Sequence, residues 1–292
     1  MKLEEVKKTT VIGAGMMGSQ IAEILSRIGG YEVNIVDMNS DLVSKGLEAI
    51  EGRLERFFVA KGKLTAEEKQ RIMGRIKGST SANEAVKDVD FAIEAAVENL
   101  AIKREIFKKL DESAPPRTIL ASNTSNQNIS DIASATNRPE QVVGVHFFNP
   151  VGAMKLVEVV RGARTSDETV ELARELASKL GKEPVVCRDA SYGFLANRAY
   201  AAMANEAVQM LWERVAPPEE IDKALKLGYN LPMGPLELMD FVGGWPLWVS
   251  SEQDAMRELG PEKGRLHPLL RAMARAGYAK IYDFWNDVLS KW

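Results

Sequence analysis

Cysteine and histidine are scarce in this chain of 292 residues. The single cysteine, Cys187, excludes an intramolecular disulfide framework and is typical of a reducing compartment. No group of cysteine and histidine has the spacing of metal ligands, so we expect no metal site. No apolar run approaches the roughly 20 residues needed to span a bilayer. We therefore expect no membrane partner.

Charge of neither sign predominates, since 38 lysines and arginines face 41 acidic residues and leave a net charge of −3. This balance argues against nucleic acid as a partner. The first five residues include two glutamates and no apolar core, so we expect no signal peptide and a cytoplasmic location. An apolar content of 45% is that of a soluble globular protein, and the length suggests two domains.

Short apolar runs alternate with amphipathic segments over the first two thirds of the chain. The runs predict strands at residues 6–12, 33–37, 89–95, 118–121, 142–147, 156–160 and 184–187. Helical spacing follows three of them, at residues 17–28, 102–110 and 169–180. Strands that alternate with helices are typical of a mainly parallel sheet. We therefore expect residues 1–187 to form an α/β domain of the Rossmann type.

Two regions depart from this alternation. Residues 40–77 are long, charged and helical in pattern, and Gly62 is the expected break in a helical hairpin that projects from the domain. From residue 188 onward only helical spacing remains, which predicts an all-α C-terminal domain over 188–292. We expect its helices at residues 193–214, 217–227, 236–258, 266–275 and 279–291.

The first strand leads directly into Gly13-Ala14-Gly15-Met16-Met17-Gly18. This is the dinucleotide fingerprint, in which the glycines permit a tight turn, a close approach to the pyrophosphate and close helix packing. Asp37 ends the next strand, where a carboxylate accepts bonds from the ribose 2′-hydroxyl and repels a 2′-phosphate. We therefore expect NAD rather than NADP. The alternative is a glycine-rich turn without a nucleotide, with Asp37 as a solvated loop acid.

One of the two histidines, His146, lies at the end of an expected strand, in His146-Phe147-Phe148-Asn149-Pro150. Glu158 follows twelve residues later in the next strand. A histidine held by a carboxylate is a general base near neutral pH, and hydride transfer to a nicotinamide is the matching reaction. The alternatives are a hydrogen-bonded histidine at a strand end and a charge on an edge strand.

Several motifs together resemble the L-3-hydroxyacyl-CoA dehydrogenase family, and especially its short members, the 3-hydroxybutyryl-CoA dehydrogenases. The resemblance runs from about residue 6 to 277. It is carried by the glycine fingerprint, residues 94–100 (EAAVENL), 121–125 (ASNTS), 146–150 (HFFNP) and 231–238 (LPMGPLEL). It implies NAD-dependent, reversible oxidation of short (S)-3-hydroxyacyl-CoA thioesters, as in fatty acid β-oxidation, by a homodimer.

The resemblance also implies roles for single residues. His146 resembles the catalytic base and Glu158 the carboxylate that orients it. Ser125 resembles the serine that hydrogen-bonds the substrate oxygen, although it could be a turn residue. Asn197 resembles a second polar contact to the substrate, although it could be a helix residue at the domain interface. Glu98, Lys103 and Asn149 match positions near cofactor or substrate. Lys103 could equally form a surface ion pair, and Asn149 could serve the turn before Pro150.

The charged insertion is the region that contacts coenzyme A phosphates in the resembled family. Its basic side chains are Lys45, Arg53, Arg56, Lys61 and Lys63. A solvated charged helix face is the alternative. Two other functions stay open: an NAD-dependent dehydrogenase of a free hydroxy or sugar acid, such as gulonate, and a non-catalytic NAD-binding protein. The second histidine, His267, is expected to be structural.

Overall fold

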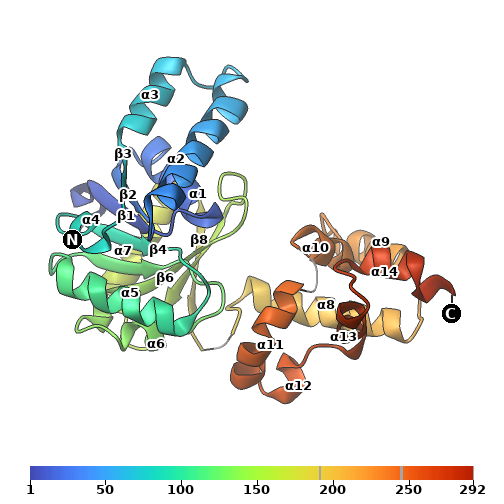
Figure 1. Ribbon diagram of the computed structural model, residues 1–292. Coiled ribbons are helices and arrows are strands. Elements are labelled where there is room, and N and C mark those ends of the chain that lie inside the picture. Colours follow the sequence, from blue (N-terminus) through green and yellow to red (C-terminus); the bar gives the residue numbers. More distant parts are fainter. Residues whose placement is uncertain (191, 244–245, 292) are drawn as a thin grey trace. The chain divides into compact units, whose positions relative to one another are not determined.

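The computed structural model describes residues 1–190, 192–243 and 246–291, without the side chains of 247–251 and 254. The chain divides into two compact units, residues 1–190 and 191–292 (Figure 1). Each unit is described by itself. The division falls three residues beyond the expected boundary. The last strand runs on to Arg188, and Asp189 accepts hydrogen bonds from the backbone N–H and the hydroxyl of Ser130.

The first unit is built on one eight-stranded sheet with the order β3-β2-β1-β4-β5-β6-β7-β8. The strands are β1 (Lys8–Ile12), β2 (Glu32–Val36), β3 (Ile76–Ser79), β4 (Phe91–Glu94), β5 (Ile119–Ser122), β6 (Val142–Phe147), β7 (Leu156–Arg161) and β8 (Glu183–Arg188). All neighbouring pairs are parallel except β6 and β7, which are antiparallel. The carboxyl ends of β1 to β6 and the start of β7 therefore share one edge.

Helices cover both faces of this sheet, as the alternating pattern predicts. On one face α1 (Met16–Arg27) and α7 (Asp167–Lys179) pack apolar side chains against the sheet in a single core. On the other face lie α4 (Ala82–Ala85), α5 (Leu100–Ser113) and α6 (Ile129–Ala133), which contact one another in sequence order. The mainly parallel, Rossmann-type α/β fold is confirmed.

The insertion is a helical hairpin that projects from the sheet (Figure 1). Helix α2 (Ser40–Leu54) continues into a π-helical turn (Glu55–Val59), and the chain reverses at Gly62, whose φ of +64° suits a glycine. Helix α3 (Ala66–Gly74) returns to the sheet. The helical reading of residues 76 and 77 is wrong, because they begin β3, which pairs with β2 from Ile76 to Ser79.

The regular secondary structure in the described residues of the second unit is helical. Its α-helices are α8 (Ala196–Trp212), α9 (Pro218–Tyr229), α10 (Pro235–Phe241), α11 (Pro246–Leu259), α12 (Pro261–Gly264), α13 (Pro268–Arg275) and α14 (Ile281–Asp287). The single helix expected at 236–258 is wrong: α10 ends at Phe241, Gly243 has a φ of +120°, and Pro246 opens α11. No helix among the described residues has the length and apolar character that a membrane crossing requires.

Candidate active site

Five of the predicted motifs meet at the carboxyl edge of the sheet. The glycine loop follows β1, Asp37 follows β2, Glu98 follows β4, Ser125 follows β5, and His146 lies near the end of β6. The strand order reverses between β1 and β4, and ligands bind open α/β sheets at such a point. The fold therefore brings together residues that are separated by more than one hundred positions in the sequence.

The glycine loop has the tight geometry that a dinucleotide requires. A Cβ at Gly13 would lie 2.5 Å from the carbonyl oxygen of Ala95, and one at Gly18 would lie 1.8 Å from that of Gly13. A Cβ at Gly15 would meet nothing within 4 Å, so this glycine faces open space. The first N–H groups of α1 have no partner within the helix. The loop and helix terminus thus fit a pyrophosphate.

Asp37 is oriented by the glycine loop. Its carboxylate accepts hydrogen bonds from the N–H of Ala14 at 2.8 Å and from that of Met38 at 2.7 Å. Met38 is exposed, and neither Lys nor Arg stands next to Asp37 in the sequence. A carboxylate offers about four acceptor sites, so two remain for a ribose hydroxyl. This arrangement fits NAD.

His146 and Glu158 are direct partners across the β6–β7 pair. Their side chains point to the same face of the sheet, and His146 Nδ1 lies 2.8 Å from Glu158 Oε2. Both side chains are buried, with 4% and 1% of their surfaces exposed. The ring of Phe148 lies 4.4 Å from that of His146. The carboxylate therefore fixes the imidazole plane and accepts the Nδ1 proton, so that Nε2 is the acceptor nitrogen of the neutral ring.

Glu98 organises the loop that carries Ser125. Its Oε1 accepts hydrogen bonds from the Thr124 hydroxyl and, at 3.0 Å each, from the N–H groups of Ser125 and Asn126. The Ser125 side chain is half-buried, and its hydroxyl forms no hydrogen bond with the described residues. The bonds to Glu98 hold the backbone of Ser125 in place, and its hydroxyl is suited to bond a ligand.

Lys103 lies beneath this loop rather than at the surface. Its ammonium group lies 2.8 Å from Glu94 Oε1 and 3.2 Å from Glu98 Oε2, and its side chain is 1% exposed. Glu94, which is fully buried, also accepts a bond from the Ser122 hydroxyl at 2.6 Å. In this geometry Lys103 supports Glu98 and has no open path to a ligand. The surface ion pair considered from the sequence is wrong, because the pair is buried.

Two polar residues at this edge were missed in the sequence. Glu94 is one, and Asn123 is the other: its side-chain oxygen accepts the Phe147 N–H at 2.8 Å. That bond extends the pairing of β5 with the end of β6, next to His146. A signal was available, because Glu94 and Asn123 directly end or follow apolar strands, the position from which functional side chains extend.

Of the remaining predicted residues, Asn149 belongs to this edge of the sheet, and the others belong to the second unit and to the insertion. Asn149 follows β6 and is exposed. Asn197 is in the first turn of α8, in the second unit, and is half-buried. On the helical insertion Lys45, Arg56, Lys61 and Lys63 are exposed, whereas Arg53 pairs with Glu23 at 2.8 Å. Arg53 therefore serves the packing of α2 on α1.

The second histidine has a structural position. His267 precedes α13, and its Nδ1 accepts the Leu269 N–H at 3.1 Å while Nε2 lies 2.8 Å from the Gln209 side-chain oxygen. The accepted bond requires an unprotonated Nδ1, so the ring donates from Nε2. Burial lowers the pKa of His267, which keeps the ring neutral. The histidine caps a helix, in agreement with its expected structural role.

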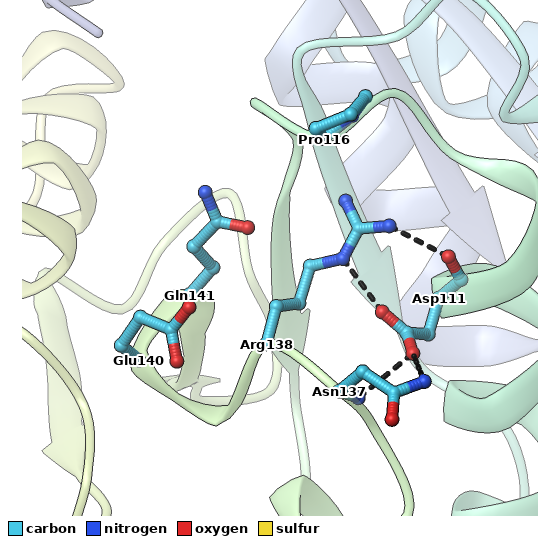
Figure 2. Close-up of a pocket in the computed structure, with 6 residues that line it drawn as sticks. All are labelled: Asp111, Pro116, Asn137, Arg138, Glu140 and Gln141. Carbon is cyan, nitrogen blue, oxygen red and sulfur yellow. Dashed lines mark hydrogen bonds and ion pairs between the residues drawn. The ribbon is translucent and has the colours of Figure 1, made fainter.

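A cavity of about 360 Å³ lies away from this edge (Figure 2). It opens before the starts of β5 and β6, at the amino ends of the strands, beside Pro116 and Gln141. Its arginine, Arg138, bonds the Asp111 carboxylate at 2.6 Å and the backbone carbonyls of Pro115 and Asp111. These contacts close the end of α5, so the cavity walls are structural.

Comparisons with known proteins identify the family. A family model described as the NAD binding domain of 3-hydroxyacyl-CoA dehydrogenase matches residues 8–190, and one described as its C-terminal domain matches residues 193–281. The chain belongs to the 3-hydroxyacyl-CoA dehydrogenase family. The resemblance predicted from the motifs is confirmed, and the protein is an NAD-dependent oxidoreductase of this family.

Similar proteins agree over nearly the whole chain. The chain is 46% identical to the probable 3-hydroxybutyryl-CoA dehydrogenase of Bacillus subtilis over 274 residues, a region that covers 94% of each protein. It is 43% identical to the human mitochondrial hydroxyacyl-coenzyme A dehydrogenase, covering 82% of this chain and 76% of the human one. The crystal structure of (S)-3-hydroxybutyryl-CoA dehydrogenase PaaH1 from Ralstonia eutropha matches with a TM-score of 0.88 at 39% identity, covering 96% and 97% of the two chains.

Proposed function

We propose that this protein oxidises short (S)-3-hydroxyacyl-CoA thioesters, such as 3-hydroxybutyryl-CoA, to 3-oxoacyl-CoA, and that it catalyses the reverse reaction as well. The observation that carries this proposal is the buried His146–Glu158 pair at the sheet edge that also holds the glycine loop. The similarity to proteins named for this activity supports the substrate class.

In this proposal His146 is the general base. Its Nε2 takes the proton of the 3-hydroxyl group, and Glu158 stabilises the imidazolium that forms. In the reverse direction His146 returns the proton to the 3-oxo group. Bound NAD would supply the hydride acceptor. The residues that would hold it are Gly13 to Gly18 at the phosphates and Asp37 at the ribose.

Polar residues around the base would orient the substrate and the cofactor. Ser125 donates its hydroxyl to the substrate oxygen, and Asn197 makes a second polar contact from the helical unit. Glu98 contacts the cofactor with its partly exposed carboxylate, and Lys103 acts beneath it as a positioning residue. Asn149 contacts cofactor or substrate through its exposed amide. These roles rest on the geometry above and on the matched family motifs.

The helical insertion is proposed to bind the coenzyme A moiety. Arg56 and Lys61 both lie over the ring of exposed Phe57, at 5.4 and 5.6 Å. Lys45 and Lys63 add exposed positive charge on the same insertion. Cationic groups with an exposed aromatic ring suit a nucleotide that carries phosphates.

We further propose that residues 1–187 bind NAD, that residues 188–292 bind substrate and form a homodimer, and that the enzyme works in the cytoplasm in fatty acid metabolism.

The dimer proposal is supported by large apolar side chains that the second unit exposes, including Leu227, Tyr229 and Phe241, each more than 70% exposed. Patches of such residues mark interaction surfaces. Light scattering on the wild type and a Leu227→Lys variant tests it: loss of the dimer in the variant is expected.

The proposed activity is tested by NADH absorbance with (S)-3-hydroxybutyryl-CoA, free 3-hydroxybutyrate and gulonate as substrates, each with NAD and with NADP. We expect turnover with NAD and the thioester only. Turnover on a free acid alone would favour the hydroxy acid dehydrogenase alternative. Binding of NAD without turnover on any substrate would favour the non-catalytic alternative.

A further inference from the structure

Gln20 connects α1, the helix that begins in the glycine loop, with the loop that follows β6. It lies in the second turn of α1, two residues after Gly18, and its side chain is largely buried. Its Nε2 donates to the carbonyl oxygen of Met16 at 3.1 Å and to the Asn149 side-chain oxygen at 3.0 Å. Its Oε1 accepts the backbone N–H of Val151 at 2.9 Å. The Gln20 side-chain amide is therefore bonded on both sides.

These bonds determine which way the Asn149 amide points. A backbone N–H can only donate, so the Val151 N–H requires an oxygen from Gln20. The Gln20 amide then presents its nitrogen to Asn149, and a nitrogen donor requires the Asn149 oxygen. The Asn149 NH2 group is left to face outward, on an exposed residue three positions after the base. Without Gln20 nothing in this chain of bonds would favour one amide orientation over the other.

The loop itself is anchored independently of this orientation. The buried Lys182 ammonium donates to the carbonyl oxygens of Val151 and Met154, the latter at 2.8 Å. Lys182 makes no bond to Asn149 among the contacts of the described residues. The loop between β6 and β7 thus has one anchor that holds its backbone and a second that also sets the Asn149 amide.

We propose that Gln20 is a positioning residue that fixes the Asn149 side chain as a hydrogen-bond donor to a ligand carbonyl oxygen. The inference rests on the proposed function for the identity of the ligand. Two carbonyls have the required chemistry, the nicotinamide carboxamide and the acyl thioester. Gln20 acts through Asn149 and touches neither ligand.

Three variants test this role. Gln20→Met has a similar length and removes both polar atoms. Asn149→Ala removes the donor. Asn149→Asp keeps an acceptor for Gln20 Nε2 but replaces the outward donor by an acceptor. Two quantities are measured for each variant. The dissociation constant of NADH, by fluorescence, reports on a bond to the nicotinamide carboxamide. The kcat/KM of acetoacetyl-CoA reduction at saturating NADH reports on a bond to the acyl thioester.

We expect Gln20→Met and Asn149→Ala to reduce the same one of these two quantities, either the affinity for NADH or kcat/KM, by about tenfold each. This is the scale of one hydrogen bond to a ligand. The double variant should be no weaker than Asn149→Ala alone, because both changes remove one interaction. Asn149→Asp should lose at least as much as Asn149→Ala. Lys182→Met is the matched control: it removes the other loop anchor, so its effect should multiply with that of Asn149→Ala.

The proposal is overturned if Gln20→Met and Asn149→Ala multiply as Lys182→Met does, since Gln20 would then only anchor the loop. It is also overturned if Asn149→Asp matches the wild type in both quantities, a result that does not depend on how well Gln20→Met folds. If the wild type does not reduce acetoacetyl-CoA, the proposed function fails, and the dissociation constant of NADH alone decides the role of Gln20.

Discussion

The Glu158→Gln substitution tests the electrostatic role of the buried pair. Glutamine keeps the size of glutamate and an oxygen that can accept the Nδ1 proton of His146, so the imidazole can stay in place. What it removes is the negative charge next to a ring that becomes positive when it takes the substrate proton. The effect should therefore fall on the transition state rather than on substrate or cofactor binding.

The expected magnitude follows from the geometry. Nδ1 and Oε2 are 2.8 Å apart and both side chains are buried. Two unit charges centred about 4 Å apart attract by about 4 kcal/mol at an effective dielectric constant of about 20. A neutral hydrogen bond retains part of this attraction. We therefore expect kcat to fall by about two to three orders of magnitude.

The assay is steady-state reduction of acetoacetyl-CoA by NADH, with NADH binding measured separately by fluorescence. We expect the dissociation constant of NADH to change less than about threefold, since Glu158 lies among protein groups in β6 and β7. Glu183→Gln is the matched control, the same change at an exposed position on neighbouring β8. A Glu158→Gln enzyme with more than a tenth of wild-type kcat would refute the reasoning.

Three further predictions concern the cofactor and the two titrating groups. Asp37→Ala should weaken the binding of NAD by about tenfold and that of NADP by less, because the lost carboxylate bonds only a ribose without a 2′-phosphate. Equal losses of affinity for the two cofactors in fluorescence titrations would contradict the ribose role. Since burial lowers the pKa of His267, its contribution to stability is present above the unfolded pKa of about 6.5 and is lost as the pH falls below it. The melting temperature should decrease from pH 7.5 to 5.5 by less in His267→Asn, which retains a capping side chain, than in the wild type. Burial, with the Glu158 and Asp189 carboxylates, raises the pKa of Cys187 to about 11. Iodoacetamide at pH 8 should therefore modify the thiol of the native protein about 100-fold more slowly than that of the unfolded protein. Similar modification rates would contradict the raised pKa.

The sheet and the base could be predicted because their signals are local. The strand at residues 142–147 is apolar apart from Gly144 and His146, and the structure has the same bounds for β6. A turn then reverses the chain into the next apolar run, which places His146 opposite Glu158. The glycine loop was predictable for the same reason, since three glycines at fixed spacing between a strand and a helix predict a tight turn at that point.

Other features depend on contacts that are distant in the sequence. Strand β3 holds four residues, of which only Ile76 is buried, so its pattern resembles the end of the preceding helix. The burial of Lys103 follows from carboxylates nine and five positions earlier that face it from one side, and lysines are almost never fully buried without such partners. Gln20 offered a faint signal, a polar residue on the apolar stripe of α1 that Met17, Ile21 and Ile24 define, but its partners are about 130 positions away.

The most direct test of the account follows deuterium from C3 of the substrate. Wild-type protein, NAD and (S)-3-hydroxybutyryl-CoA deuterated at C3 should yield NADH with one deuterium on the nicotinamide ring, detected by mass spectrometry. The His146→Gln variant should bind NADH as the wild type does and transfer deuterium at least about 100-fold more slowly. Deuterium that appears in the solvent, or transfer at the wild-type rate without His146, would contradict hydride transfer driven by this base.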